Sequence, residues 1–295
     1  MPRTRVLEVE AQSIMSPSKL PDADFVLNPY TGCEFGCVYC YATFMGRYVG
    51  ESREAWGKYV YVKLNAVDLL RRDLARLPAA KRTATLLMSS VTDPYQGIEK
   101  KYRLSRGLLD VLAEVGYPGR IGILTKSPLV LRDIDVLVQL PHPEVGLTVT
   151  TTDDALSRYL ELRAPLASAR LKTLAKLRLA GISTYCFVGP LLPHFGEQPQ
   201  LLDALFAAIA ATGVEAVYVE HMNMSTYIAE RIRARIAGET EVVRDMYERA
   251  GLPDHRARLD GLVGELLQKH GLHLRLEEVL RHDEGVAASA ARRVD

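Results

Sequence analysis

The chain has 295 residues, 48% of them hydrophobic, and its 37 basic and 36 acidic side chains leave a net charge of +1. This composition excludes an intrinsically disordered chain, and the balanced charge gives no global field for a polyanionic partner, although it leaves room for a local basic patch. The first residues lack the apolar run of a signal peptide, and no stretch reaches the roughly 18 uninterrupted apolar residues of a membrane span. We therefore expect a soluble, cytoplasmic protein with no membrane association.

The N-terminal segment, residues 1–24, contains Pro17 and Pro21 and is predicted to be an irregular strap. From about residue 25 to residue 225 the chain repeats a short apolar, β-branched run, a turn and an amphipathic helical stretch, which is the pattern of βα units. The predicted strands are 25–30, 84–91, 120–125, 144–151, 184–191 and 216–220. The helices predicted between them are 66–77, 104–116, 130–140, 169–181 and 200–213.

Strands separated by about 30 to 40 residues, with helices between them, require right-handed crossovers and a parallel sheet. The sequence therefore predicts an α/β fold in which residues 25–225 form a closed or nearly closed array. Residues 226–295 are predicted to form a mostly helical C-terminal extension, with helices in 225–251 and 254–271, a short strand in 273–280, and an Ala/Arg-rich tail that frays.

Polar residues follow all six predicted strands. The segments at the strand ends are TGCEFGCVYCYA, SSVTDPYQGIE, TKSP, TTTDD, GPLLPHFG and EHMNMS, whereas the connections at the opposite ends are ordinary turns. Since function in parallel α/β folds lies at the carboxyl ends of the strands, this asymmetry indicates one functional face.

Three of the four cysteines, Cys33, Cys37 and Cys40, form a C-x3-C-x2-C motif after the first predicted strand, and Cys186 lies some 150 residues away. A structural zinc site ordinarily uses four ligands. Three thiolates on a [4Fe-4S] cluster instead leave one iron open to an exogenous molecule. The alternatives are a zinc loop and an iron–sulfur sensor or electron carrier without catalysis.

The C-x3-C-x-aromatic-C motif at the end of the first strand of a βα array resembles the radical S-adenosylmethionine (SAM) superfamily. This resemblance implies a partial (β/α)6 barrel, a [4Fe-4S] cluster held by Cys33, Cys37 and Cys40, and SAM chelated by the open iron. It also implies that the reduced cluster cleaves SAM to a 5′-deoxyadenosyl radical, which abstracts a hydrogen atom from the substrate. An external one-electron reductant of the flavodoxin or ferredoxin type is then required.

CVYCY, SSVTDPYQGIEKKY, ILTKS, LTVTT and the stretch from APLASARLKTLAKLRLAGI to VGPLLPHF resemble the spore photoproduct lyase-like branch over residues 25–225. The likeness implies that residues flanking the cluster and following the strands bind SAM. These are Tyr39, Tyr41, Ser90, Lys126 and Thr151, to which we add Thr92 and Asp93 as binders of the SAM amino group.

One departure from the lyase concerns its hydrogen-donor cysteine, because the corresponding stretch here, MSSVTDP, offers Ser89 and Ser90. A serine O–H bond is too strong for this role, so repair by the lyase mechanism would need Cys186 as the donor. Strand alternation allows Cys186 to point into the barrel, and the alternative is a core cysteine. Tyr41 is the second catalytic candidate.

Further candidates lie beyond these motifs. Glu220, His221 and Asn223 end the sixth predicted strand, where they either contact substrate or form a polar cluster against the C-terminal extension. Arg170 fits an arginine that recurs in the branch, or else forms a salt bridge at the start of a helix. The sequence thus predicts a radical SAM enzyme acting on an unidentified small molecule or nucleic acid, with lesion repair or nucleotide modification as the alternative.

Overall fold

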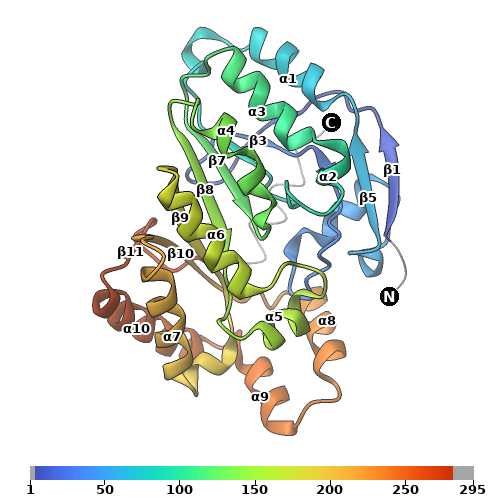
Figure 1. Cartoon of the computed structure of the whole chain (residues 1–295). Helices are drawn as coiled ribbons and strands as arrows, with labels where there is room; N and C mark the ends of the chain where they lie inside the picture. The colour runs from blue at the N-terminus through green and yellow to red at the C-terminus, as the bar shows by residue number, and fades with distance from the viewer. Residues whose placement is uncertain (1–3, 282–295) are drawn as a thin grey trace.

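The computed structural model describes residues 4–281 of the chain (Figure 1). The strands are β1 (Arg5–Val9), β2 (Met15–Pro17), β3 (Phe25–Leu27), β4 (Tyr30–Thr31), β5 (Tyr59–Lys63), β6 (Leu86–Met88), β7 (Ile121–Thr125), β8 (Pro143–Thr148), β9 (Ser183–Leu191), β10 (Ala216–His221) and β11 (His273–Leu274). The predicted Ala/Arg-rich tail lies outside the described residues.

The α-helices are α1 (Ala66–Ala75), α2 (Glu99–Tyr102), α3 (Leu104–Glu114), α4 (Ile134–Leu137), α5 (Asp154–Glu161), α6 (Ala167–Leu179), α7 (Pro199–Ala210), α8 (Thr226–Ile236), α9 (Glu241–Arg249) and α10 (Pro253–His270). The 3-10 helices are η1 (Tyr41–Tyr48), η2 (Arg53–Ala55), η3 (Ala79–Lys81), η4 (Pro128–Asp133) and η5 (Pro193–Gly196).

The main sheet has the strand order β11-β10-β9-β8-β7-β6-β3-β2. Strands β3, β6, β7, β8, β9 and β10 are parallel and follow one another in chain order, β11 extends the sheet in parallel, and β2 pairs antiparallel with β3. This arrangement is the open, partial (β/α)6 barrel predicted from the sequence, and the prediction of an α/β fold is confirmed.

Helices cover the outer face of this sheet, with α3, α4 and α6 in front of β7 and β8 in Figure 1. The burial of α3 illustrates why these segments are helical: Leu104, Leu108 and Leu112 recur at four-residue intervals and are at most 6% exposed. Burying such apolar faces against the β-branched strands builds one continuous core.

The N-terminal prediction was wrong in one respect, since the segment is not simply an irregular strap. β1 pairs in parallel with β5, and β5 pairs antiparallel with β4, which gives a second, three-stranded sheet. This sheet lies at the right of Figure 1. It matters for function because β4 leads directly into the cysteine segment.

The C-terminal extension is mostly helical, as predicted. Helices α8 and α9 lie at the lower edge of the molecule in Figure 1, with α8 beside α5, and α10 packs next to α7. The Arg235 side chain of α8 donates a hydrogen bond to the Tyr159 carbonyl of α5, at 2.9 Å, and its guanidinium stacks 4.0 Å from the Tyr159 ring centroid. The extension is therefore tied to the element that follows β8.

Candidate active site

The cysteine segment leaves β4 through two glycines whose backbone only glycine adopts easily. Gly32 has φ +92, and a Cβ atom built there would lie 2.5 Å from the Tyr59 carbonyl oxygen. Gly36 has φ +65, and its Cβ would lie 3.3 Å from the Cα of Gly57. Because both positions require positive φ and close approach, the loop can fold back tightly between its cysteines.

All four cysteines are free, and Cys33 and Cys37 are each 7% exposed. Burial raises the pKa of the Cys33 thiol, and Asp93, Cys37 and Cys40 raise it further. Burial raises the pKa of Cys37 to about 12, an effect that Lys126 opposes and that Cys40 reinforces. The three thiols therefore lie close enough to interact electrostatically.

Within residues 4–281, no group of three or more His, Cys, Asp or Glu side chains is arranged to hold a metal ion. A four-iron cluster spreads its ligand sulfurs more widely than a single ion does, and Cys thiolates are its usual ligands. Three free thiols on one loop, with Lys126 opposing the rise in the pKa of Cys37 and Cys40, fit such a cluster. They lack the fourth ligand of a structural zinc site.

A buried ion pair between Glu161 and Arg170 contacts the cysteine loop through Tyr39. Tyr39 donates its hydroxyl to Glu161 at the end of α5, and Arg170 of α6 pairs with the same carboxylate. Arg170 is fully buried and Glu161 is 1% exposed. Burial alone would raise the pKa of Glu161, but the charges of Arg170 and Lys126 outweigh it, so this pKa is lowered. The Lys126 ammonium lies 5.8 Å from the Tyr39 ring centroid and 3.9 Å from Glu161.

Asp93 joins the ends of β6 and β7. Its carboxylate accepts hydrogen bonds from the Thr125 hydroxyl at 2.7 Å, the Tyr95 amide at 2.9 Å and the Lys126 amide at 2.8 Å. Burial raises the pKa of Asp93, and these three bonds oppose the rise. Thr92 donates to the Gly32 carbonyl at 2.5 Å. Both residues therefore hold the strand ends and the cysteine loop together.

β6 ends at a strained serine. Ser89 has φ 67, in the left-handed region, and its buried hydroxyl has no hydrogen-bond partner in the structure. The next residue, Ser90, accepts a hydrogen bond from the Tyr41 hydroxyl through its carbonyl, and its amide donates to Asn28 at 3.1 Å. Such strain is typical of functional sites, and here it brings Tyr41 and Ser90 together.

The remaining strand-end candidates separate into two groups. Glu220 acts electrostatically on the cysteine loop: burial raises the pKa of Cys40 and Tyr41, and the charge of Glu220 raises both further. His221 lies instead beside α10 and contacts Asp260 at 2.7 Å. The Asn223 side chain accepts from the Ser225 amide at 2.9 Å, and the Thr151 hydroxyl accepts from the Asp153 amide at 3.1 Å. Each of these side chains therefore stabilises a turn at the carboxyl end of a strand.

Cys186 does not point into the barrel. It pairs in the sheet with Leu147 of β8 and Val217 of β10, both fully buried. Arg170, on the covering helix α6, is the charged group that acts on its thiol, whose pKa burial raises. Because side chains alternate along a strand, Phe187 takes the opposite face, and Cys186 belongs to the core between sheet and helices.

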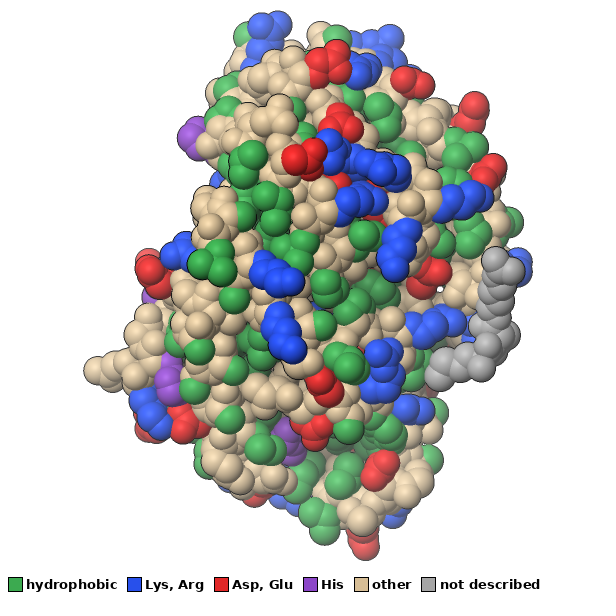
Figure 2. Space-filling model, in the orientation of Figure 1, with side chains coloured by type: hydrophobic (Ala, Val, Ile, Leu, Met, Phe, Trp, Pro, Cys, Tyr) green, Lys and Arg blue, Asp and Glu red, His purple; other side chains and the backbone are tan. Residues whose placement is uncertain are grey.

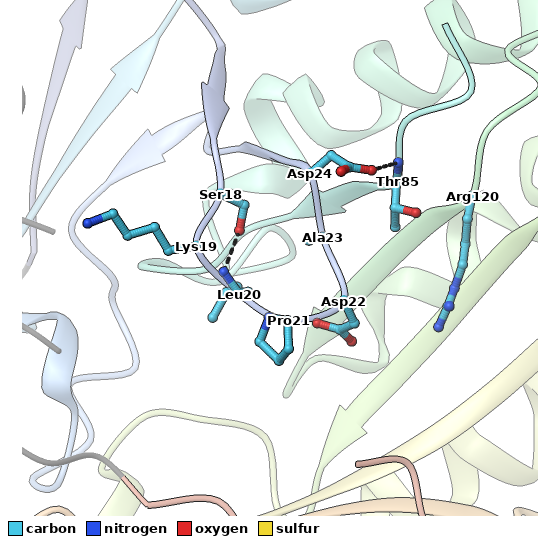
Figure 3. Close-up of a pocket in the computed structure, with 9 residues that line it drawn as sticks. All are labelled: Ser18, Lys19, Leu20, Pro21, Asp22, Ala23, Asp24, Thr85 and Arg120. Atoms are coloured by element: carbon cyan, nitrogen blue, oxygen red, sulfur yellow. Dashed lines mark hydrogen bonds between the residues drawn. The ribbon is translucent and has the colours of Figure 1, made fainter. Parts of the chain in front are cut away.

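A polar cavity of about 520 Å³ lies at the other end of the strands (Figure 3). The segment 18–24 lines it together with Thr85 and Arg120, the residues immediately before β6 and β7. Asp22 in this segment accepts a hydrogen bond from Tyr218 of β10. The cavity therefore belongs to the amino ends of the strands and is separate from the cysteine loop.

Three residues of the site were not predicted from the sequence. Glu161 lies at the end of α5. Ser157, four residues earlier, donates to it at 2.9 Å, and this spacing is the sequence pattern that could have indicated the contact. Gln96 is fully buried and accepts from the Glu34 amide at 2.8 Å. Arg231 of α8 donates to the Cys37 carbonyl at 3.2 Å, a contact that crosses 194 residues and leaves no local pattern.

Comparison with known proteins identifies the family. Residues 27–205, more than half of the chain, match the model of the radical SAM superfamily. The chain belongs to the radical SAM superfamily. This membership supports an enzyme, implies an iron–sulfur cluster and SAM, and brings the general need for an external electron donor. Among the described residues, no helix is long and apolar enough to cross a membrane.

Two relatives illustrate the range of similarity to curated proteins. Uncharacterized protein MJ0683 of Methanocaldococcus jannaschii is 34% identical over 191 residues, 65% of this chain and 69% of that protein. The radical SAM Nalpha-GlyT isomerase of Pseudomonas phage M6 is 26% identical over 227 residues, 74% of this chain and 45% of the phage protein.

Among solved structures, spore photoproduct lyase complexed with dinucleoside spore photoproduct superimposes with a TM-score of 0.66 at 15% identity, covering 92% of this chain and 82% of the lyase chain. At this identity the likeness shows a shared fold. The predicted resemblance to spore photoproduct lyase is confirmed for the fold.

Proposed function

We propose that the chain cleaves SAM reductively at a [4Fe-4S] cluster held by Cys33, Cys37 and Cys40 and abstracts a hydrogen atom from its substrate. The observation that supports this most is the set of three free, interacting thiols on one loop at the carboxyl edge of a parallel sheet. The bound cluster supplies the electron that breaks SAM into methionine and a 5′-deoxyadenosyl radical.

We assign the binding of SAM to side chains around this loop: Tyr39, Tyr41, Ser90, Thr92, Asp93, Lys126 and Thr151. Lys126 brings a cation toward the loop, and Asp93 holds the end of β7 that carries it by accepting from the Thr125 hydroxyl and the Lys126 amide. An external one-electron donor of the flavodoxin or ferredoxin type completes the reaction. We place the protein in the cytoplasm, whose reducing environment keeps the cysteine thiols free.

Anaerobic reconstitution with iron and sulfide, followed by dithionite and SAM, tests this proposal. We expect the wild-type chain to produce 5′-deoxyadenosine and Cys37→Ala to lose both the cluster absorbance and the product. Cys186→Ala is the matched control, because that thiol lies in the core between sheet and helices. Persistent 5′-deoxyadenosine in Cys37→Ala, or a wild-type chain that assembles no cluster, contradicts the proposal.

A second candidate names nucleic acid as the substrate, and a row of side chains on η1 favours it. Tyr41 and Phe44 have ring centroids 6.4 Å apart, and the Arg47 guanidinium lies 5.5 Å from the Phe44 ring and 4.7 Å from the Tyr48 ring. Tyr48 is 51% exposed, and Arg47 is exposed and makes no ion pair within residues 4–281.

Proteins that bind single-stranded nucleic acid stack the bases on exposed aromatic rings and contact the phosphates with arginines that have no acidic partner. This row of side chains starts beside Cys40, so a nucleic acid strand bound to it would reach the proposed site of hydrogen abstraction. Figure 2 also shows Lys and Arg side chains gathered across the middle of one face, although the whole chain carries only +1. The lyase relative, whose solved complex contains a dinucleoside, adds support.

Fluorescence anisotropy with a labelled single-stranded oligonucleotide, at several salt concentrations, measures this binding. We expect Arg47→Ala to weaken binding several-fold and to reduce the salt slope by about 0.7, the contribution of one phosphate contact on a single strand. Arg76→Ala, an exposed arginine at the end of α1, should change neither quantity. Equal affinities for wild type and Arg47→Ala would reject nucleic acid binding at this row.

A further inference from the structure

The helix that opens the C-terminal extension contacts the cysteine loop. Arg231, on α8, donates from Nη2 to the Cys37 carbonyl at 3.2 Å. One turn earlier on the same face of α8, the Tyr227 ring lies 5.1 Å from the Arg53 guanidinium of η2. The extension is therefore docked on both the loop that carries the cysteines and the segment that follows it.

The other terminal nitrogen of this guanidinium, Nη1, has no hydrogen-bond partner in the described part of the chain. Nη1 of Arg231 is shielded from solvent and donates to no hydrogen-bond acceptor, and the side chain forms no salt bridge within residues 4–281. Buried guanidinium donors are almost always paired, because an unpaired one forfeits its hydration. An unpaired, charged donor beside the cysteine loop indicates an acceptor that residues 4–281 do not provide.

Two cationic side chains approach the cysteine loop. Arg231 bonds to the Cys37 carbonyl at 3.2 Å, and the Lys126 ammonium lies 5.8 Å from the Tyr39 ring centroid. Lys126 comes from the end of β7 and Arg231 from α8, so the two cations come from different parts of the chain. Of the two, Lys126 also lies 3.9 Å from Glu161, whereas Arg231 forms no salt bridge among the described residues, although it is near enough to the exposed Glu54 to act on it electrostatically.

We infer that Arg231 is a positioning residue that sets the reduction potential of the cluster, with its unpaired Nη1–H directed to the cluster or its thiolate ligands. Adding an electron makes a cluster with three thiolates more negative, and a nearby cation stabilises that reduced form. Loss of the guanidinium should lower the potential. The inference rests on the cluster of the proposed function, and it gives the C-terminal extension a role in electron uptake.

Redox titration of the reconstituted protein, monitored by electron paramagnetic resonance without SAM, tests this role separately from catalysis. We expect Arg231→Met to make reduction roughly tenfold less favourable, which is a fall of about 59 mV for a one-electron couple. Arg231→Lys keeps the charge without the planar fork, so its potential should lie between those of wild type and Arg231→Met.

Arg235→Met is the matched control, because Arg235 lies one turn further along α8 and also donates to a main-chain carbonyl, that of Tyr159. It should loosen the extension equally and leave the potential unchanged. Loss of iron from Arg231→Met but not from Arg235→Met would support the inference. Equal reduction potentials in wild type and Arg231→Met would overturn it, and so would equal shifts of the potential in the two variants. A wild-type chain without a cluster would instead defeat the proposed function.

Discussion

At the scale of single residues, the most consequential contact is the buried pair of Glu161 and Arg170. The Glu161 carboxylate also accepts from Tyr39 and Ser157, so three side chains, from the cysteine loop, α5 and α6, donate to one carboxylate. Removing one partner of a buried pair leaves the other charge without compensation. The stability of the cysteine loop therefore depends on this carboxylate.

We predict that Glu161→Gln lowers the free energy of unfolding by about 3 to 5 kcal/mol. Glu248→Gln is the matched control, since Glu248 accepts two hydrogen bonds from Arg233 at 2.6 and 2.7 Å but both side chains are about half exposed. It should cost under about 1 kcal/mol. Urea unfolding curves measure both values, and a Glu161→Gln variant as stable as Glu248→Gln would show that the buried pair is not needed.

At the scale of elements, the parallel strands could be predicted because they are buried on both sides and read as continuous apolar runs. β1 and β5 were missed because they pair with each other outside the main sheet, and the burial of β1 varies without a clean alternation. The predicted strand 84–91 shortens to β6, because Ser89 turns the chain into the left-handed region.

The predicted helix 130–140 likewise becomes η4 followed by the short α4. Its N-terminus is set by Ser127, whose hydroxyl accepts from the Leu129 amide just beside Pro128. The motif predicts the three cluster ligands from sequence alone, since their spacing is local. The partners of the cysteine loop, Glu161 and Arg231, could not be predicted, because their contacts depend on how distant helices pack.

At the scale of the whole molecule, the C-terminal extension is joined to the barrel through a buried histidine. His221 ends β10, is 2% exposed, and contacts Asp260 of α10. Burial lowers the pKa of His221 below 6.5, Asp260 opposes this shift, and Arg256 and Arg281 add to it. The folded protein therefore binds a proton at this site less readily than the unfolded chain does.

The lower pKa of His221 in the folded state determines how the free energy of unfolding changes with pH. Because the pKa is lower in the folded state, the neutral imidazole stabilises the protein above about pH 6.5, and this contribution is lost as the pH falls through the folded value. We predict that the wild-type chain loses more unfolding free energy between about pH 7.5 and 5.5 than His221→Gln does. The glutamine amide can still contact Asp260, but it does not take up a proton.

Urea unfolding at a series of pH values measures this difference, with His142→Gln as the control. His142 is exposed at the start of β8, and its carbonyl accepts from the Ile121 amide, so the substitution leaves that main-chain bond in place. The control should follow the wild-type curve, while His221→Gln should flatten it. Three parallel curves would mean that His221 does not link the packing of α10 on the barrel to protonation.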